Sequence, residues 1–144
     1  MPIIQVKYSV PAQNAEGAKP GLVNEIAAAA SRLSAQYLRK DPTVTAVTVE
    51  PVPAANWFAG GVSLAEQKKA SFFLDIKIVD GTNTKDEKAA FIAAVFKTMD
   101  ELLGPLHTES YVYVHDVAAS AYGFGGLTQE RRYIAGKLGV PVAA

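Results

Sequence analysis

The sequence contains no cysteine in 144 residues. This absence excludes a disulfide framework, a thiolate nucleophile and a cysteine-ligated metal site. An excess of one charge is also lacking, because 14 lysines and arginines balance 14 aspartates and glutamates. Such a chain has no strong field to attract nucleic acid or an anionic membrane, so we expect neither partner.

Long apolar runs are missing as well. No stretch approaches the ~20 residues of a membrane span, and residues 1–10 lack the basic start and long apolar segment of a secretory signal. We therefore expect a cytoplasmic protein. The hydrophobic content is 49%, which is ample for one core, and we expect residues 1–144 to form a single domain.

The hydrophobic periodicity predicts two successive strand-helix-strand units. Strict alternation and β-branched residues predict strands, and apolar positions at helical spacing predict helices, the second of which starts at a capping box of Thr84 and Glu87. The predicted strands are 3–10, 44–52, 71–79 and 110–117, and the predicted helices are 22–38 and 84–103. The organisation is thus a first unit at 2–52, a connecting loop at 53–70, a second unit at 71–117 and a C-terminal tail at 118–144.

Two such units predict an α/β chain of the α+β two-layer sandwich type. Each helix crosses over the same face of its strand pair, giving a four-stranded sheet with two helices on one face. Valines and aromatic residues occur on both faces of strands 71–79 and 110–117. The face without helices is therefore expected to be buried by other subunits.

Several short marks along the chain occur in a characteristic order. They are Pro2 directly after the initiator methionine, Lys40-Asp41-Pro42 after the first helix, Gly60-Gly61, Gly81, and Tyr111, Tyr113 and Asp116 in the last strand. Over about residues 2–126 this order resembles the tautomerase superfamily, which includes 4-oxalocrotonate tautomerase (4-OT) and macrophage migration inhibitory factor (MIF). The length is nearest to the two-unit MIF-like branch. The resemblance implies a tautomerase/MIF-like fold, a homotrimer, no cofactor and a small carboxylic acid as substrate.

Pro2 is the candidate catalytic base. Methionine is normally removed before a small residue such as proline, and this leaves a secondary amine at the N-terminus. Burial in an apolar pocket disfavours the protonated amine and lowers its pKa toward the working pH, so the amine can move a proton next to a carbonyl. The alternative is that Pro2 only begins a strand, where its missing N-H does no harm.

Lys40 falls where the MIF-like branch has its pocket lysine, and Arg39 is next to it, so both are candidate substrate-binding residues. Their alternative role is to complement the helix dipole at a C-terminus. The resemblance also places Tyr111 and Tyr113 at the pocket, often from a neighbouring subunit. A hydroxyl there can stabilise an oxyanion, and we assign Tyr111 a catalytic role and Tyr113 a binding role, although that branch has asparagine at the second position. Cross-strand aromatic packing is the alternative for both tyrosines.

Two apolar residues complete the predicted substrate-binding set. Trp57 lies in the connecting loop, where it can form a pocket wall or pack against another subunit, and Ile76 lies in strand 71–79. That strand lacks the arginines of the dehalogenase and decarboxylase relatives, which makes halide-forming hydration less favoured.

Two further motifs are interpreted as having no such role. His107, His115 and Asp116 are not arranged to bind a metal, because adjacent strand residues point to opposite faces, so no metal site is predicted. Residues 123–126 imitate a phosphate loop but lack its Lys-Ser/Thr pair.

The sequence therefore predicts keto-enol proton transfer on a small 2-keto or enol carboxylic acid. One alternative is a hydratase, dehalogenase or decarboxylase in which a protonated Pro2 acts as an acid. The other is a non-catalytic MIF-like binding protein.

Overall fold

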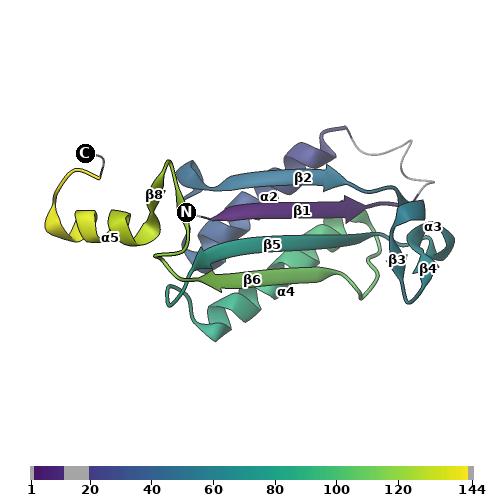
Figure 1. Ribbon diagram of the computed structural model, residues 1–144. Helices are drawn as coiled ribbons and strands as arrows, with labels where there is room; N and C mark the ends of the chain where they lie inside the picture. Colours follow the sequence, from purple (N-terminus) through teal and green to yellow (C-terminus); the bar gives the residue numbers. More distant parts are fainter. Residues whose placement is uncertain (1, 12–19, 143–144) are drawn as a thin grey trace.

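Four strands form one mixed sheet, and two long helices cover one of its faces, in a computed structural model that describes residues 2–11 and 20–142 (Figure 1). The sheet order is β2-β1-β5-β6. β1 pairs in parallel with β2 and antiparallel with β5, and β5 pairs in parallel with β6. The strands are β1 (Ile3–Ser9), β2 (Ala46–Pro51), β5 (Ser71–Val79) and β6 (Tyr111–Val117), and the helices are α2 (Leu22–Leu38) and α4 (Lys85–Leu103). The predicted fold class is confirmed.

The core lies between the sheet and the two helices. Alternate residues of the two central strands point into it, as the period of two predicted. They are Ile4, Val6 and Tyr8 from β1 and Phe72, Leu74, Ile76 and Ile78 from β5, all with at most 7% of their surface exposed. The helices contribute residues at helical spacing, among them Ile26 and Leu33 from α2 and Phe91 and Val95 from α4. The residues between these positions point to the other face of the sheet, which the two long helices do not cover.

Both helices end or begin where the sequence indicated. At the start of α4, the Thr84 hydroxyl accepts from Glu87 N at 3.1 Å and the Glu87 carboxylate accepts from Thr84 N at 2.8 Å, which is the predicted capping box. α2 stops at Leu38 because Arg39 adopts a left-handed conformation, with φ of 56°. The chain then makes a short 3-10 turn, η1 (Pro42–Val44), which delays β2 to Ala46, two residues later than predicted. Residues 12–19 of the loop predicted at 11–21 lie outside the described residues.

Each unit is followed by a two-stranded hairpin, which the periodicity did not resolve, and then by a helix. After β2 come η2 (Ala54–Asn56), β3 (Phe58–Ala59), β4 (Val62–Ser63) and α3 (Leu64–Gln67), and after β6 come β7 (Gly123–Phe124), β8 (Leu127–Thr128) and α5 (Gln129–Leu138). A Gly-Gly pair with positive φ forms both turns, since two consecutive positive φ angles are the requirement of a type I′ hairpin. Residues 123–126, which imitate a phosphate loop in sequence, are therefore a hairpin turn.

The hairpins repeat one another closely. Leu64 N donates to Trp57 O at 2.8 Å in the first, and Gln129 N donates to Tyr122 O at 2.9 Å in the second. Ser63 and Thr128 cap the helices that follow. The architectural repeat of the two units thus extends beyond the sheet.

The second hairpin and α5 project from the end of the sheet (Figure 1). α5 leaves Tyr133, Ile134 and Leu138 exposed. Across residues 2–11 and 20–142, none of the helices combines the length and the apolar character that a membrane span requires.

Candidate functional site

Pro2 lies just before β1, at the end of the sheet where β2 begins and β5 ends. Its side chain is buried, and its carbonyl accepts from Ala46 N at 3.2 Å at the start of β2. On the other side of β1, Ile3 is opposite Lys77 near the end of β5. Because α2 leads into β2 and β5 leads into α4, the end of α2 and the start of α4 lie at this same end of the sheet.

Lys40 and Arg39 are joined here to the loop between β5 and α4. Lys40 Nζ donates to Thr82 Oγ1 at 3.0 Å, and Arg39 donates to Thr82 O at 3.3 Å. Arg39 also forms an ion pair with Glu87, the capping residue of α4. The two predicted cations thus lie beside the end of the sheet that holds Pro2.

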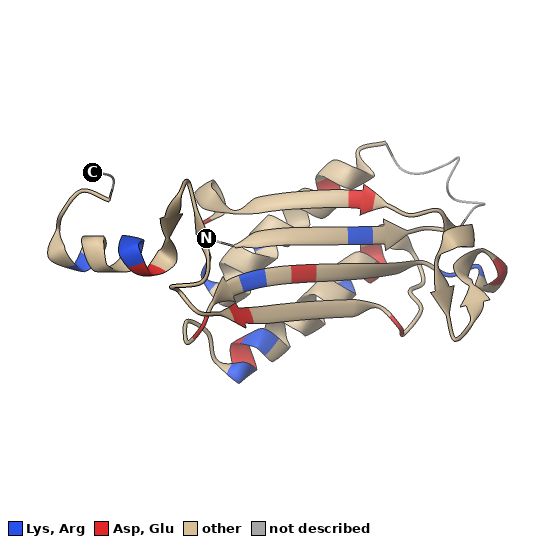
Figure 2. Cartoon of the chain, in the orientation of Figure 1, with Lys and Arg blue, Asp and Glu red and all other residues tan. Residues whose placement is uncertain are grey.

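The charges of this end are not equivalent. Figure 2 shows lysines and acidic residues gathered at the start of α4 and the end of β6. Arg39 is paired with Glu87, and Lys88 is paired with Asp116. Among the described residues, by contrast, no carboxylate oxygen forms an ion pair with Lys40. No ion pair among these residues therefore neutralises the Lys40 ammonium.

The surroundings of Lys40 also change its pKa. Burial disfavours the charged ammonium and lowers the pKa of Lys40, and the positive charge of Arg39 lowers it further. Asp116 acts in the opposite direction and raises the pKa. The dominance of burial means that Lys40 is partly desolvated, which strengthens its attraction for a carboxylate.

Tyr111 and Tyr113 lie on the open face of the sheet. They belong to a ladder of stacked rings in β6, with centroids 6.3 Å apart for Tyr111 and Tyr113 and 5.7 Å apart for Tyr113 and His115. Phe73 of β5 packs against the same ladder, with its ring centroid 5.4 Å from that of Tyr113. The exposed fractions of 45% for Tyr111 and 47% for Tyr113 are large for packed aromatic rings.

A single chain does not bring Tyr111 to Pro2. In the strand register, Tyr111 of β6 is paired with Phe73 of β5, and Phe73 is paired with Lys7 of β1. From Lys7 back to Pro2 is five residues, or about 17 Å along an extended strand. The two residues also lie on opposite faces, so Tyr111 does not approach Pro2 within one chain.

Trp57 is far from Pro2 within the chain, whereas Ile76 is paired with Ile4, two residues from Pro2. Trp57 precedes β3 beyond the far end of β2, where it is half-buried against a small cluster of Ala54, Ala59 and Leu64. Ile76 has none of its surface exposed and packs under the helices. Their substrate-binding roles stay predictions, and the structure gives both residues packing partners in their own chain.

Two residues at the Pro2 end were missed by sequence reasoning. Thr82 contacts both Arg39 and Lys40, and its only sequence signal is its place between the end of a strand and the capping Thr84. Tyr122 follows β6, is half-buried, and has a pKa raised by burial. The Gly-Gly repeat was the signal for Tyr122, because it sets Tyr122 in the place that Trp57 holds in the first hairpin.

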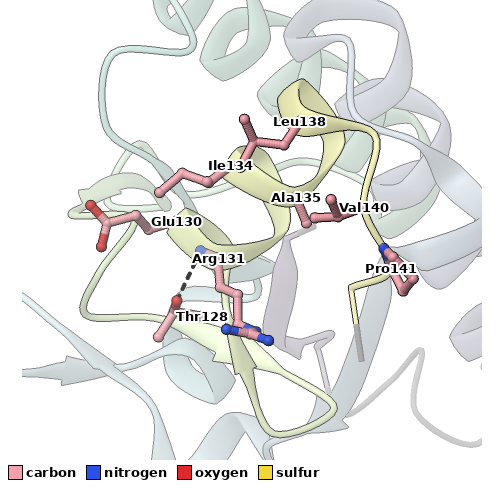
Figure 3. Close-up of a pocket in the computed structure, with 8 residues that line it drawn as sticks. All are labelled: Thr128, Glu130, Arg131, Ile134, Ala135, Leu138, Val140 and Pro141. Carbon is pink, nitrogen blue, oxygen red and sulfur yellow. Dashed lines mark hydrogen bonds between the residues drawn. The ribbon is translucent and has the colours of Figure 1, made fainter. Parts of the chain in front are cut away.

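Two hollows lie apart from Pro2. A cavity of about 320 Å³ is formed by α5 and the chain after it, and Figure 3 shows its mainly apolar lining, including Ile134, Leu138 and Val140. Another of about 460 Å³ lies on the open sheet face and includes Lys7, Glu50 and Phe73. None of the predicted site residues lines either hollow. Within the described residues, no three histidine, aspartate or glutamate side chains are grouped to hold a metal ion.

Solved structures match the fold over most of the chain, whereas no family model and no curated protein matches the sequence. A fused 4-OT wild-type symmetric trimer has a TM-score of 0.73 at 19% identity, covering 89% of this chain and 96% of that one. Pt0534 inactivated by 2-oxo-3-pentynoate has a TM-score of 0.74 at 17% identity, covering 90% and 98%. A macrophage migration inhibitory factor-like protein from Entamoeba histolytica has a TM-score of 0.67 at 17% identity, covering 88% of this chain and 97% of that one. At sequence identities this low, the matches show a likeness of fold alone.

Proposed function

The chain has the tautomerase-superfamily fold found in fused 4-OT and MIF proteins, and from this premise we propose that it is a cofactor-independent tautomerase with Pro2 as its general base. One observation carries the proposal: Pro2 is buried at a strand end that also holds Lys40, a cation that forms no ion pair with a carboxylate among the described residues. The substrate class is a small 2-keto or enol carboxylic acid.

The proposed reaction moves one proton within the substrate. With Met1 removed, the Pro2 nitrogen is a secondary amine, and burial lowers its pKa so that a neutral fraction is present at the working pH. In ketonisation this amine takes the enol hydroxyl proton and delivers it to the adjacent carbon, so no atom is gained or lost. The Lys40 ammonium holds the carboxylate, and a tyrosine hydroxyl donates to the oxygen on which negative charge develops.

Assembly is part of the proposal, because Tyr111 cannot reach Pro2 in the same chain. We propose a homotrimer, as in the fused 4-OT symmetric trimer, with the open sheet face buried between subunits. The exposed ladder that contains Tyr111 and Tyr113 lies on this face. Tyr111 of one subunit then completes the Pro2 site of the next.

Subunit mixing tests this sharing. Tyr111→Phe and Pro2→Ala proteins are each expected to be impaired, and trimers reassembled from both are expected to regain activity, because some sites then combine an intact Pro2 with an intact Tyr111. The measurement is the ketonisation rate of the mixture against the sum of the two separate rates. Native mass spectrometry verifies that the subunits have exchanged. If the rate of the exchanged mixture only equals the sum of the two separate rates, the site is not shared.

The experiment that tests the function itself is the ketonisation of phenylenolpyruvate and 2-hydroxymuconate by protein whose N-terminus has been checked by mass. Turnover above buffer is expected, with kcat/KM rising as pH passes upward through the Pro2 pKa, because the neutral amine is the active form. A rate that falls with rising pH favours the acid role of Pro2, and unsaturated and halogenated acids are then the substrates to assay. No turnover of any of these acids favours the non-catalytic binding protein.

Lys40 and Arg39 are expected to differ in their effects on substrate binding. Lys40→Gln should raise KM by about 10-fold or more, because a charge-assisted contact is lost. Arg39→Gln should change KM by less than about threefold, since the Arg39 side chain is 66% exposed and already paired with Glu87. Steady-state kinetics of the two variants provide the comparison, and equal effects on KM would remove the distinction.

A further inference from the structure

Three hydrogen bonds join the loop between β5 and α4 to the end of α2. Asn83 Nδ2 donates to Leu38 O at 3.1 Å, Arg39 donates to Thr82 O at 3.3 Å, and Lys40 Nζ donates to Thr82 Oγ1 at 3.0 Å. Each of the first two joins a side chain of one segment to a backbone carbonyl of the other. The third joins two side chains, those of Lys40 and Thr82.

The role of the Thr82 hydroxyl follows from its single hydrogen. Thr82 Oγ1 lies 2.6 Å from Val79 O, which can only accept, and a weaker contact of 3.4 Å reaches Asn83 Oδ1. A hydroxyl has one donor and two acceptor positions, so donation to Val79 leaves only acceptor positions facing Lys40. Thr82 therefore binds the ammonium specifically as an acceptor.

Thr82 differs in this respect from the partners of the neighbouring cations. Glu87 and Asp116 are carboxylates, so they neutralise Arg39 and Lys88. The hydroxyl of Thr82 is neutral and leaves the charge of Lys40 intact while occupying one of its three N-H donors. A lysine side chain has a flexible four-carbon stem, and a neutral acceptor can restrain this stem without competing for the charge.

We infer that Thr82 is a positioning residue that holds the Lys40 ammonium in place to bind the substrate carboxylate. This role rests on the proposed function, in which Lys40 makes that contact. Thr82 itself does not touch the reacting atoms, and the effect of its hydroxyl is transmitted through Lys40.

A purely structural role for Thr82 makes different predictions. If the hydroxyl only closes the turn after β5, its removal weakens folding and affects kcat and KM without regard to Lys40. If it positions Lys40, its removal raises mainly KM, and serine at position 82 keeps KM at the parental value. Removal of the hydroxyl then has no effect on KM when Lys40 is absent.

The test compares Thr82→Val, Thr82→Ser, Lys40→Met and the double variant Thr82→Val/Lys40→Met. Thr82→Val is expected to raise KM for phenylenolpyruvate about 3- to 10-fold with kcat within about twofold, the range expected for one hydrogen bond. Thr82→Ser should stay within twofold of the parent in both, and the valine should add nothing in the Lys40→Met background. An unchanged KM in Thr82→Val, or a full additional effect in the double variant, would overturn the inference.

A second measurement does not depend on turnover. NMR titration of protein with ¹⁵N-labelled lysine, assigned with Lys40→Met, follows the Lys40 ammonium directly. Loss of an acceptor that favours the charged form should lower the titration midpoint in Thr82→Val, and serine should restore it. An unmoved midpoint overturns the positioning role, whereas absent turnover with a moved midpoint refutes only the proposed function. Urea unfolding of each variant verifies that the folded state is retained.

Discussion

Pro2→Ala is expected to lower kcat/KM for ketonisation by about 100-fold or more, within the range of 10² to 10⁴ that a general base contributes. Alanine still permits removal of Met1 and still leaves an amine at the N-terminus. That amine is primary and rotates freely, whereas the pyrrolidine ring of Pro2 prevents free rotation about the N–Cα bond just before β1. The loss therefore measures the positioning of a secondary amine, since small displacements of a catalytic group are costly.

Matched preparations make this result specific. Mass spectrometry must find the same N-terminal residue position in parent and variant, because a retained methionine converts the Pro2 nitrogen into an amide without basic character. Pro141→Ala is the control, since Pro141 is exposed near the C-terminal end of the described chain, and its kcat/KM should stay within about twofold. A Pro2→Ala protein with more than half of the parental kcat/KM would leave Pro2 as no more than the start of a strand.

The layers of the fold could be predicted from sequence because their signals are local. Alternation at Ile4, Val6 and Tyr8 fixes which face of β1 is buried, and Thr84 with Glu87 fixes where α4 begins. Each signal lies within a few residues of the element it specifies. Agreement among such local preferences is what allows a sequence to indicate its own architecture.

The site was less predictable because its contacts are long-range. Lys40 and Thr82 are 42 residues apart, and nothing in either local pattern indicates that they meet. The separation of Tyr111 from Pro2 depends on the antiparallel pairing of β1 with β5, which periodicity does not determine. The hairpins escaped prediction because strands of two residues are too short to show a period, although their Gly-Gly pairs were visible.

Ile76→Ala is the second variant with a large expected effect, and this effect is on stability. Ile76 has none of its surface exposed and lies among the residues packed between sheet and helices. Truncation of a fully buried isoleucine removes transfer free energy and leaves a cavity, so the free energy of unfolding should fall by about 2–5 kcal/mol. The lower part of this range applies if α2 and α4 move closer to fill the space.

The same variant separates the core role of Ile76 from its predicted substrate-binding role. Urea unfolding at one fixed subunit concentration measures the stability change, because association contributes to the stability of an oligomer. Ile92→Ala is the control, since Ile92 lies on α4 with 39% of its surface exposed and should cost less than about 1.5 kcal/mol. A folded Ile76→Ala protein should keep the parental KM, because a side chain packed beneath the helices has no surface to offer a ligand. A KM raised severalfold with little loss of stability would instead place Ile76 at the substrate, and would require the core beneath Pro2 to open when the substrate binds.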